Sequence, residues 1–406
     1  MTQLIKMAFR ELLRNKRRSF FSSLALGIGL ALLLLMASVI SGEMRYSMES
    51  AVKLQSGHLQ VQAKTYNEAK NSLAYEDLIA EPDATSEKIA GLAPVKVATP
   101  RLVASGILTN NDETNGVRLF GIDPESPASD PFKQEILSGD WIQPDDRSGI
   151  MIGQALAQKM NLKSGDSVNL MANTSNGDVD QQMFTIRGVF TTRTPAFDDY
   201  TVILPIAKAQ ALTKTEGHAS LIYVLLDDPA QVDAVRKALT TETMQIKTYL
   251  EMNDMILQME EFSRSYMVFI YLIVLAITAT VIVNTLVMSV FERTREIGIL
   301  SAIGMKSTRI MSMFFIESGF LAIGGIVAGL IIGGLMVYYA STVGFYFGDV
   351  GSTGLLIGER IYAYMQINDA VTLTILAFAV AILAALYPAI MAARLEPVEA
   401  MRGGKN

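Results

Sequence analysis

The chain has 406 residues, of which 50% are hydrophobic and 18% charged, with a mean hydropathy of +0.31 and a formal net charge of −6. This composition is too apolar for an ordinary soluble protein and too polar for a bundle of membrane helices alone, so it predicts a few membrane spans joined to a large soluble part. The acidic balance argues against nucleic acid as a partner. Because the chain has no cysteine, disulfide usage does not identify its compartment.

The first predicted element is an amphipathic helix within residues 1–18. Basic residues occupy one side of this helix. Its apolar side is formed by Leu4, Ile5, Ala8, Phe9, Leu12 and Leu13. This pattern is typical of a helix that lies in the plane of a membrane surface, and we expect it on the inner leaflet before the first span.

Four apolar stretches are each long enough to cross a bilayer, which takes about 20 residues of helix. The first is longer than the apolar core of a signal peptide, so we expect it to be retained. The third contains one acidic residue, Glu317, near its start, and its uncharged part runs over 318–348. The predicted transmembrane helices are 19–42, 265–291, 310–340 and 370–393.

The distribution of Lys and Arg predicts the orientation. These residues gather before the first span, between spans two and three, and in the tail 394–406, whereas the loop 341–369 contains only Arg360. Short loops rich in Lys and Arg stay in the cytoplasm. We therefore expect a multi-pass protein of the bacterial cytoplasmic (inner) membrane, with both termini cytoplasmic and residues 43–262 outside. That outer segment has 19 Lys and Arg against 31 Asp and Glu, a net charge of −12.

The outer segment is predicted to be a mixed α/β domain. Strands are expected at 58–63, 102–108, 117–122, 167–171, 183–190, 200–204 and 221–226, from β-branched or alternating residues. Helices are expected at 84–92, 154–160, 206–212 and 230–239. Strand–helix–strand order at both ends indicates one subdomain interrupted by a β-rich insert of about 110–215. The turn-rich stretch 110–116 is interpreted as the start of the insert.

Apolar residues continue at helical spacing beyond the outer ends of spans one and two, which predicts two helical stalks. Methionine is flexible and polarizable, so such a surface could accept acyl chains. Packing of one stalk on the other explains the same spacing and is the favoured interpretation. The possible hydrophobic contact residues are Met44, Met48, Met255, Met259, Phe262 and Tyr266.

The sequence lacks the common patterns of catalytic and nucleotide-binding sites. The only Gly-Gly-Lys lies at the C-terminal end, with no following helix, and is not a phosphate-binding loop. His58 and His218 are too isolated for a typical metal site. We therefore expect no catalytic residues, no metal and no cofactor in this chain, and we do not expect an enzyme.

The segment 292–308 between spans two and three combines alternating charges with a short apolar helix closed by Gly304. Such a helix could dock into a groove of another protein, or it could merely cap two helices. The charged residues are Glu292, Arg293, Arg295 and Glu296, and the apolar residues are Ile297, Leu300 and Ile303.

Small residues recur at four-residue spacing in spans one and three, which allows close approach of helices in lipid. Packing is the favoured interpretation, within one chain or between two. The residues are Ser23, Gly27, Gly325, Gly329 and Gly333. Glu317 in span three lies within about two turns of Arg309, so pairing or extension toward the interface is favoured over a proton relay.

Three segments carry a resemblance to a known family. Residues 284–305 (NTLVMSVFERTREIGILSAIGM) closely resemble the coupling helix of FtsX-like permeases, the subfamily of ATP-binding cassette (ABC) transporters that includes MacB-type exporters and Lol-type lipoprotein-releasing permeases. Residues 387–402 resemble the family's last span end, and residues 8–18 are similar to its N-terminal helix.

The resemblance implies a type VII ABC permease with a porter-like outer subdomain and an insert. It implies a separate cytoplasmic ATPase, which binds ATP and Mg and grips residues 292–305, and a second permease, identical or paralogous. Such proteins convert closure of the ATPases into movement outside the membrane, which is called mechanotransmission.

Within the family, residues 56–61, 121–125, 149–157 and 162–166 look most like the lipoprotein-releasing branch. The chain departs from that branch at 172–182, which is short and lacks the proline of the hook that binds a soluble carrier. The expected function is extraction or export of a hydrophobic substrate outside the membrane, such as a lipoprotein. The alternatives are a mechanotransmitter that activates an outer partner such as a hydrolase, and a MacB-like peptide or drug efflux pump.

Overall fold

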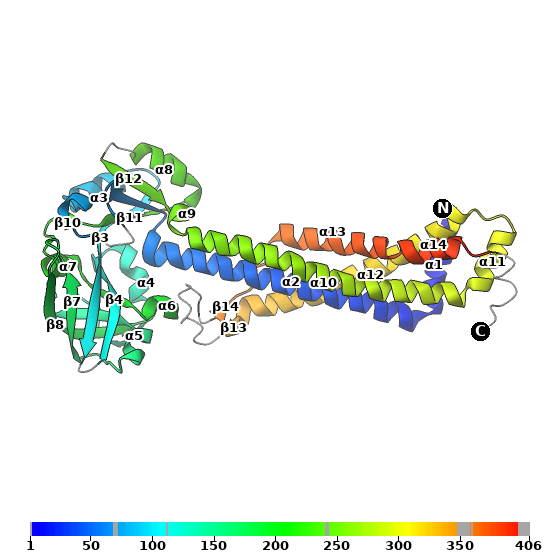
Figure 1. The fold of residues 1–406 in the computed structure, drawn as a ribbon, viewed down its shortest axis with the longest axis horizontal. Helices are drawn as coiled ribbons and strands as arrows, with labels where there is room; N and C mark the ends of the chain where they lie inside the picture. Colours follow the sequence, from blue (N-terminus) through cyan, green and yellow to red (C-terminus); the bar gives the residue numbers. More distant parts are fainter. Residues whose placement is uncertain are drawn as a thin grey trace. The chain divides into compact units, whose positions relative to one another are not determined.

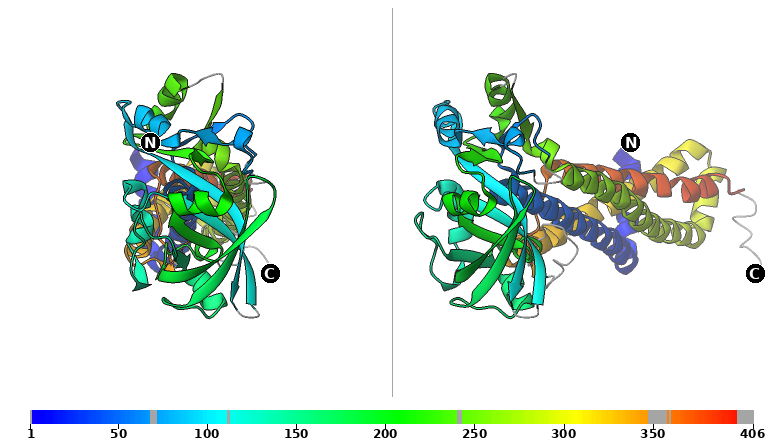
Figure 2. Two further views of the ribbon diagram at one scale, coloured as in Figure 1. Left: turned by 90° about the vertical axis from the view of Figure 1, so that its left-hand side faces the viewer. Right: turned by 60° about the vertical axis from the view of Figure 1, so that its left-hand side comes forward.

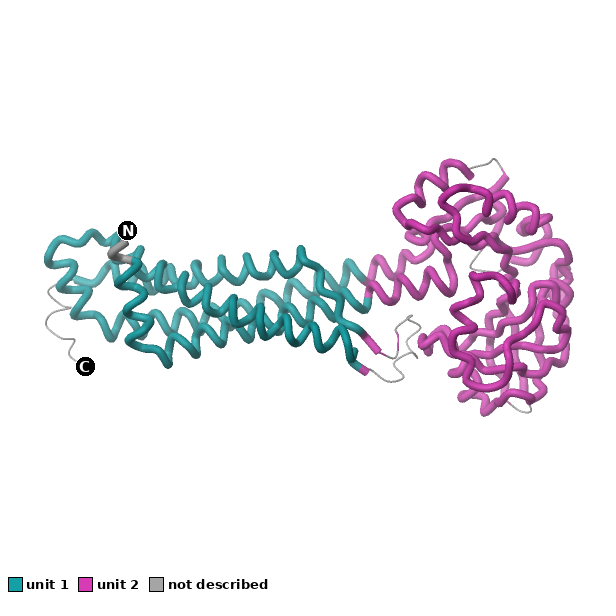
Figure 3. The backbone as a smooth tube through the Cα atoms, turned by 180° about the vertical axis from the view of Figure 1, so that it is seen from behind, with its two compact units in different colours: residues 1–43, 260–345, 362–406 teal, residues 44–259, 346–361 magenta. Residues whose placement is uncertain are grey.

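The structure is a computed structural model that describes residues 2–67, 72–110, 113–239, 243–346, 358 and 360–396. The chain divides into two compact units (Figure 3). The helical unit contains residues 1–43, 260–345 and 362–406, and the α/β unit contains residues 44–259 and 346–361.

The helical unit is built from long helices that run alongside one another (Figure 1). Four segments are long and apolar enough to cross a membrane by length and composition: α2, α10, α12 and the pair α13–α14. The helices are α1 (Thr2–Arg14), α2 (Lys16–Ala51), α10 (Asp254–Glu292), α11 (Thr294–Ala302), α12 (Ser307–Val343), α13 (Ile367–Ala384) and α14 (Leu386–Ala393). Helices α2 and α10 run past the predicted spans 19–42 and 265–291 and include the methionine-rich residues expected in the stalks.

The predicted span 370–393 is not one straight helix, because α13 and α14 meet at Ala385. Pro388 is the third residue of α14. A proline has no N–H, so the carbonyl of Ala384 lacks its usual helical donor, and proline is tolerated best in the first turn of a helix. The break therefore places Pro388 at the start of a new helix. The tail beyond residue 396 lies outside the described residues.

Helices α2 and α12 pack through their small residues within one chain. A Cβ atom added to Gly27 would lie 2.9 Å from the carbonyl oxygen of Gly325, and one added to Gly329 would lie 2.9 Å from the carbonyl oxygen of Gly27. Gly333 faces the Cα of Ala31 in the same way, at 3.0 Å. The Ser23 hydroxyl donates to the Leu321 carbonyl at 3.1 Å. These residues form a contact inside the chain, so a seam between two copies would need others.

The α/β unit is organised around a ten-stranded mixed sheet of order β12-β1-β11-β3-β4-β9-β6-β8-β5, with β7 pairing to β3 and β8. Its strands are β1 (Leu59–Ala63), β3 (Val95–Asn110), β4 (Glu113–Ile122), β5 (Ile136–Gly139), β6 (Gly149–Gly153), β7 (Ser167–Asn173), β8 (Val179–Phe190), β9 (Thr201–Pro205), β11 (Leu221–Leu226) and β12 (Met244–Thr248). Short two-residue strands pair as β2 (Ile79–Ala80) with β10 (His218–Ala219) and β13 (Phe345–Tyr346) with β14 (Arg360–Ile361).

Among the described residues, seven α-helices lie wholly within this unit. Helices α3 and α8 pack beside the part of the sheet that contains β1, β11 and β12, where they share a core of aliphatic residues. Helix α7 contacts β4, β9 and β8 over a second core. The helices are α3 (Pro82–Ala90), α4 (Asp130–Lys133), α5 (Gln154–Lys159), α6 (Pro195–Asp198), α7 (Ile206–Thr213), α8 (Val232–Leu239) and α9 (Tyr249–Met252).

Strand β3 passes from one part of the sheet to the other (Figure 2). Its first half pairs with β11, from Val95 to Arg101, and its second half pairs with β4, from Leu102 to Asn110. The interpretation of residues 110–116 as the start of the insert is therefore wrong. Asn110 ends β3 and residues 113–116 begin β4, and β3 is one continuous strand of 16 residues that begins well before residue 110.

A buried arginine and tyrosine hold the end of α2 inside the α/β unit. After Ala51 the chain makes one turn of π-helix, which is closed by a hydrogen bond from the Gly57 N–H to the Val52 carbonyl at 2.9 Å. The Tyr223 hydroxyl donates to the carbonyls of Val52 at 2.8 Å and Lys53 at 2.9 Å. The Arg101 guanidinium donates to the Leu54 carbonyl at 2.9 Å, and its central carbon lies 3.6 Å from the centre of the Tyr223 ring. The helix end is thus closed by side chains that the α/β sheet positions.

Candidate functional site at the α10–α12 junction

Helix α11 is a short helix set between two long ones. Its first residue, Thr294, donates its hydroxyl to the carbonyls of Val290 and Phe291 at the end of α10, both at 3.0 Å. It ends at Ala302, and Gly304, two residues later, has a φ of +92°, a conformation that glycine adopts without strain. The sequence analysis placed a short helix before Gly304, and α11 occupies residues 294–302 of that segment.

The inner face of α11 packs into the helical unit. Ile297 is 1% exposed and belongs to the same core as Leu286 on α10, Phe314 on α12 and Ala389 on α14. The prediction that Ile297 is part of an apolar docking surface is therefore wrong. Its side chain anchors the helix instead.

The outer face of α11 carries two exposed isoleucines one helical turn apart, Ile299 at 46% and Ile303 at 75%. Leu300 is half-buried, and Arg295 is exposed. Ile299 was not among the predicted docking residues, although its spacing of four from Ile303 could have identified it. The structure brings Arg295, Ile299 and Ile303 to the side away from the core, and we refer to these three residues as the α11 outer face.

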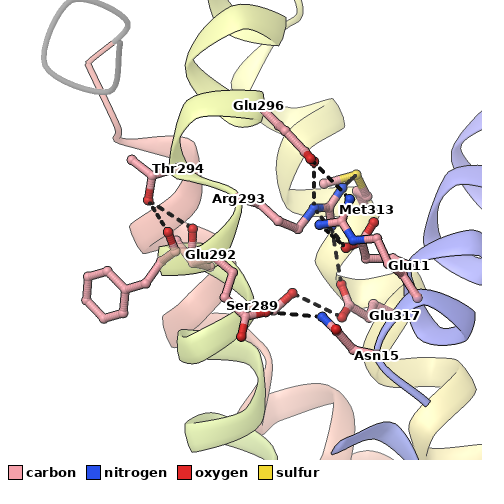
Figure 4. Close-up of polar contacts among 12 residues, drawn as sticks. Glu11, Asn15, Ser289, Glu292, Arg293, Thr294, Glu296, Met313 and Glu317 are labelled. Atoms are coloured by element: carbon pink, nitrogen blue, oxygen red, sulfur yellow. Dashed lines mark hydrogen bonds and ion pairs between the residues drawn. The ribbon is translucent and has the colours of Figure 1, made fainter. Parts of the chain in front are cut away.

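Arg293 lies directly before α11 and is 3% exposed (Figure 4). Its Nε lies 3.3 Å from Glu296 of α11 and 3.5 Å from Glu11 of α1. Its Nη1 lies 3.8 Å from Glu317 of α12. One guanidinium therefore contacts carboxylates from three helices.

Glu317 is 2% exposed and faces this arginine (Figure 4). It accepts a hydrogen bond from the Ser289 hydroxyl at 3.3 Å. Pairing was the favoured expectation for this residue, but its partner is Arg293 and not Arg309, which is exposed. The sequence distance to Arg309 was misleading because α10 brings Arg293 alongside α12.

The two remaining acids of the segment are bound by the N-terminal residues. Glu292 accepts from Arg18 at 2.7 Å and from Asn15 at 3.1 Å. Glu296 accepts from Arg14 at 3.1 Å. Burial raises the pKa of Glu296, but the hydrogen bonds from Arg14 and Arg293 outweigh burial and hold this pKa below its ordinary value. Both carboxylates are thus engaged within the chain.

The charges around Arg293 are incompletely satisfied. Its Nη1 and the Oε2 of Glu317 are buried without a hydrogen bond, and so is the Oε1 of Glu11. Buried ions without ideal partners are held at a substantial cost in desolvation. The cluster is therefore sensitive to small displacements, and any movement of α11 changes the contacts of α1 and α12 at the same time.

The predicted hydrophobic contact residues lie on α2 and α10. Within the α/β unit, Met44, Met48 and Met259 are half-buried and Met255 is exposed. Within the helical unit, Phe262 is 75% exposed and Tyr266 is 52% exposed. The next turns of α10 continue this exposed apolar surface through Phe269 and Ile273.

The amphipathic helix α1 exposes one apolar stripe and packs its other side on α12. Ile5, Phe9 and Leu13 are each about half exposed, whereas Ala8 and Glu11 are buried. The ring of Phe9 packs edge-on against Phe320 at 5.8 Å. This arrangement suits a helix with one side toward lipid.

Comparison with known proteins gives two regional matches that together span most of the chain. Residues 19–242 match the MacB-like periplasmic core domain, and residues 268–397 match the FtsX-like permease C-terminal region.

Three relatives illustrate the similarity. An uncharacterized ABC transporter permease, MJ1507, of Methanocaldococcus jannaschii is 25% identical over 66% of this chain and 66% of its own length. The lipoprotein-releasing system transmembrane protein LolC of Xylella fastidiosa is 24% identical over 96% of both chains. The macrolide export ATP-binding/permease protein MacB of Chlorobium phaeobacteroides is 25% identical over 99% of this chain and 61% of its own length.

Proposed function

This chain belongs to the family of permeases with a MacB-like periplasmic core domain and an FtsX-like C-terminal region, and from this premise we propose that it works with a separate ATPase that docks on the α11 outer face. The single observation that supports the docking site is the exposure of Ile299 and Ile303 on a helix that is otherwise anchored in the helical unit.

A protein partner suits this surface because two aliphatic side chains one turn apart can fill a hydrophobic groove. Arg295 adds a positive charge beside them, and no ion pair of Arg295 occurs among the described residues. The other charged residues of the segment are engaged internally. The docking contact would thus be mainly apolar, with Arg295 at its rim.

The Arg293 cluster would transmit the movement of the ATPase. Arg293 ties the start of α11 to Glu11 of α1 and Glu317 of α12. A displacement of α11 would lengthen the distances from Arg293 to Glu11 and Glu317. It would leave buried charges less well compensated, which costs free energy. We propose that α1, α11 and α12 therefore move together when the ATPase closes.

The substrate is proposed to be hydrophobic and to be extracted or exported on the outer side of an inner membrane, with both chain termini in the cytoplasm. The orientation rests on the positive residues near α1 and α11. The exposed apolar residues Phe262, Tyr266 and Phe269 of α10 support a surface that an acyl chain could contact. Lipoprotein release is the form of this function that the similarity to LolC supports.

The docking proposal is tested by co-purification of the full chain with an ABC ATPase subunit produced in the same cells. An Ile303→Asp variant should lose the ATPase, because a carboxylate cannot enter an apolar groove without a large desolvation penalty. The matched control is Ile107→Asp, which changes an isoleucine that is 41% exposed in the α/β unit. Equal recovery of the ATPase with both variants would contradict the proposal.

A further inference from the structure

The α/β unit contains an open cleft of about 1040 Å³ that the proposed docking site does not use. It lies along β3 and β4 and is bordered by the chain after β1, by β12 and by α9. A smaller recess of about 40 Å³ adjoins it, and Arg118, Tyr66 and Met252 line both. Arg118 therefore stands where the cleft meets its recess.

Among the residues that the structure describes, no acceptor bonds the guanidinium of Arg118. The backbone N–H of Arg118 donates to the Tyr200 carbonyl at 2.7 Å, which fixes the residue in the sheet. Its side chain lies over the Phe120 ring, with 5.4 Å from the guanidinium carbon to the ring centre. Its Nε is buried without a hydrogen bond, and no carboxylate among the described residues pairs with it.

The other polar groups around the recess are already engaged with one another. Gln62 donates to the Gln60 side chain at 2.9 Å, and Gln60 donates to the Gln55 carbonyl at 3.0 Å. Gln55 in turn donates to the Tyr200 hydroxyl at 3.1 Å. The amide side chains Gln55, Gln60 and Gln62 are thus hydrogen-bonded, whereas the buried Nε of Arg118 has no hydrogen bond among the described residues.

The carboxylate that lines the cleft, Glu251, is also engaged. It accepts from the backbone N–H of Thr248 at 2.9 Å and from Arg236 at 2.8 Å. Lys247 adds a second positive residue to the lining. A buried donor left without an acceptor is costly, so the arrangement favours an acceptor that comes from outside the chain.

We propose that this cleft binds a peptide segment through a carboxylate, which Arg118 receives at the mouth of the recess. The planar fork of a guanidinium matches a carboxylate. A multiply charged anion such as phosphate suits the site less well, because Glu251 lines the cleft and the segment 43–262 has a net charge of −12. The cleft is far larger than one carboxylate needs, and its main-chain and tyrosine lining suits several peptide residues.

The test uses the full chain in lipid nanodiscs and a pentapeptide of alanine with an N-terminal fluorescein and a free C-terminal carboxylate. Fluorescence anisotropy should show saturable binding. The C-terminal amide of the same peptide should bind at least tenfold more weakly, because it lacks the charge that Arg118 receives. Arg118→Gln should weaken binding of the free acid by a similar factor, and Arg118→Lys should give an intermediate loss.

The matched control is Arg147→Gln, which changes an exposed arginine of the same unit that does not line the cleft and should leave binding unchanged. A second measurement needs no variant. Phenylglyoxal modification of Arg118, located by mass spectrometry, should slow in the presence of the free acid and not of the amide.

Three results would overturn the proposal: no saturable binding of the free acid, equal binding of the acid and the amide, or modification of Arg118 that the free acid does not slow. Competition by inorganic phosphate as strong as by the free acid would overturn the peptide assignment. The ATPase takes no part in this assay, so failure here leaves the docking proposal untouched.

Discussion

The Nη1 of Arg293 lies 3.8 Å from the Oε2 of Glu317, and neither atom has a hydrogen bond. Both side chains are almost fully buried, so each compensates the charge of the other at a distance longer than an ideal ion pair. This contact joins the start of α11 to α12.

Replacing Arg293 with Met should destabilise the chain by about 3–5 kcal/mol, because Glu317 would then be a buried charge without a partner. Glu11 is affected less, since Arg14 lies 2.8 Å from it. Replacing Arg293 and Glu317 together with Met should recover most of the loss. Thermal unfolding of the purified chain in detergent measures both effects. A double variant no more stable than Arg293→Met would show that the two charges are not coupled.

The packing of α2 on α12 gives a prediction with a control in the same helix. Gly329→Ala should lower the unfolding temperature, because its Cβ would lie 2.9 Å from the Gly27 carbonyl oxygen and from the Leu30 Cβ. Gly334→Ala meets nothing within 4 Å and should be neutral or stabilising, since alanine favours a helix by about 1 kcal/mol over glycine. Equal effects of the two substitutions would mean that α2 and α12 do not pack as described.

Because of the Tyr223 hydroxyl, the stability of the α/β unit should fall at alkaline pH. Burial raises the pKa of Tyr223 to about 12, although the nearby Arg101 opposes this. The ordinary value is 10, so the neutral form is favoured by folding. The stabilisation is complete below pH 10 and is lost as the pH rises toward 12.

The Tyr223→Phe variant should not show this part of the loss of stability at alkaline pH, because phenylalanine has no hydroxyl to ionise. At neutral pH it should be less stable by about 1–3 kcal/mol, because the Lys53 carbonyl loses its side-chain donor and the Val52 carbonyl keeps only the Gly57 N–H. The measurement is thermal unfolding of both proteins between pH 8 and pH 12. If the two curves run parallel over the whole range, Tyr223 does not titrate as described.

If the chain extracts a hydrophobic substrate, a photo-crosslinker placed at Phe262 should capture acylated molecules such as lipoproteins. Phe262 is 75% exposed and begins the apolar surface of α10. A crosslinker at Met267, which is 4% exposed on the same helix, is the control and should capture nothing from outside the chain. Capture should fall when ATP is added with the ATPase. Capture that is equal at both positions, or unaffected by ATP, would argue against the extraction function.

The spans could be predicted from the sequence because crossing a bilayer requires a run of about 20 apolar residues, and such a run is visible in the sequence itself. It also placed the short helix between α10 and α12, from the spacing of its apolar residues and from Gly304 after them. The sequence could not show which side of α11 is buried. Ile297 was predicted to be on the docking surface, but Ile299 is the exposed isoleucine and Ile297 is buried. Both are isoleucines, and only the cores of α10, α12 and α14 decide between them.

Tertiary contacts also explain the other differences. Arg309 is nearer to Glu317 in sequence than Arg293 is, but α10 brings Arg293 to the same depth as Glu317. Strand β6 was read only as a family motif, because its five residues are buried on both faces and show no alternation. Nothing in the sequence pattern identified Arg101 as a fully buried arginine, or Arg118 as an arginine with a buried Nε, within a sheet.

The central claim is that the α11 outer face contacts a separate ATPase, and the chain has no native cysteine to interfere with a direct test. The measurement is crosslinking of single-cysteine variants to the ATPase with a short thiol-to-amine reagent. Ile303→Cys should crosslink efficiently, whereas Ile297→Cys, at a position that is 1% exposed, and Ile107→Cys, in the α/β unit, should not. Crosslinking of Ile107→Cys or Ile297→Cys but not of Ile303→Cys would contradict the account.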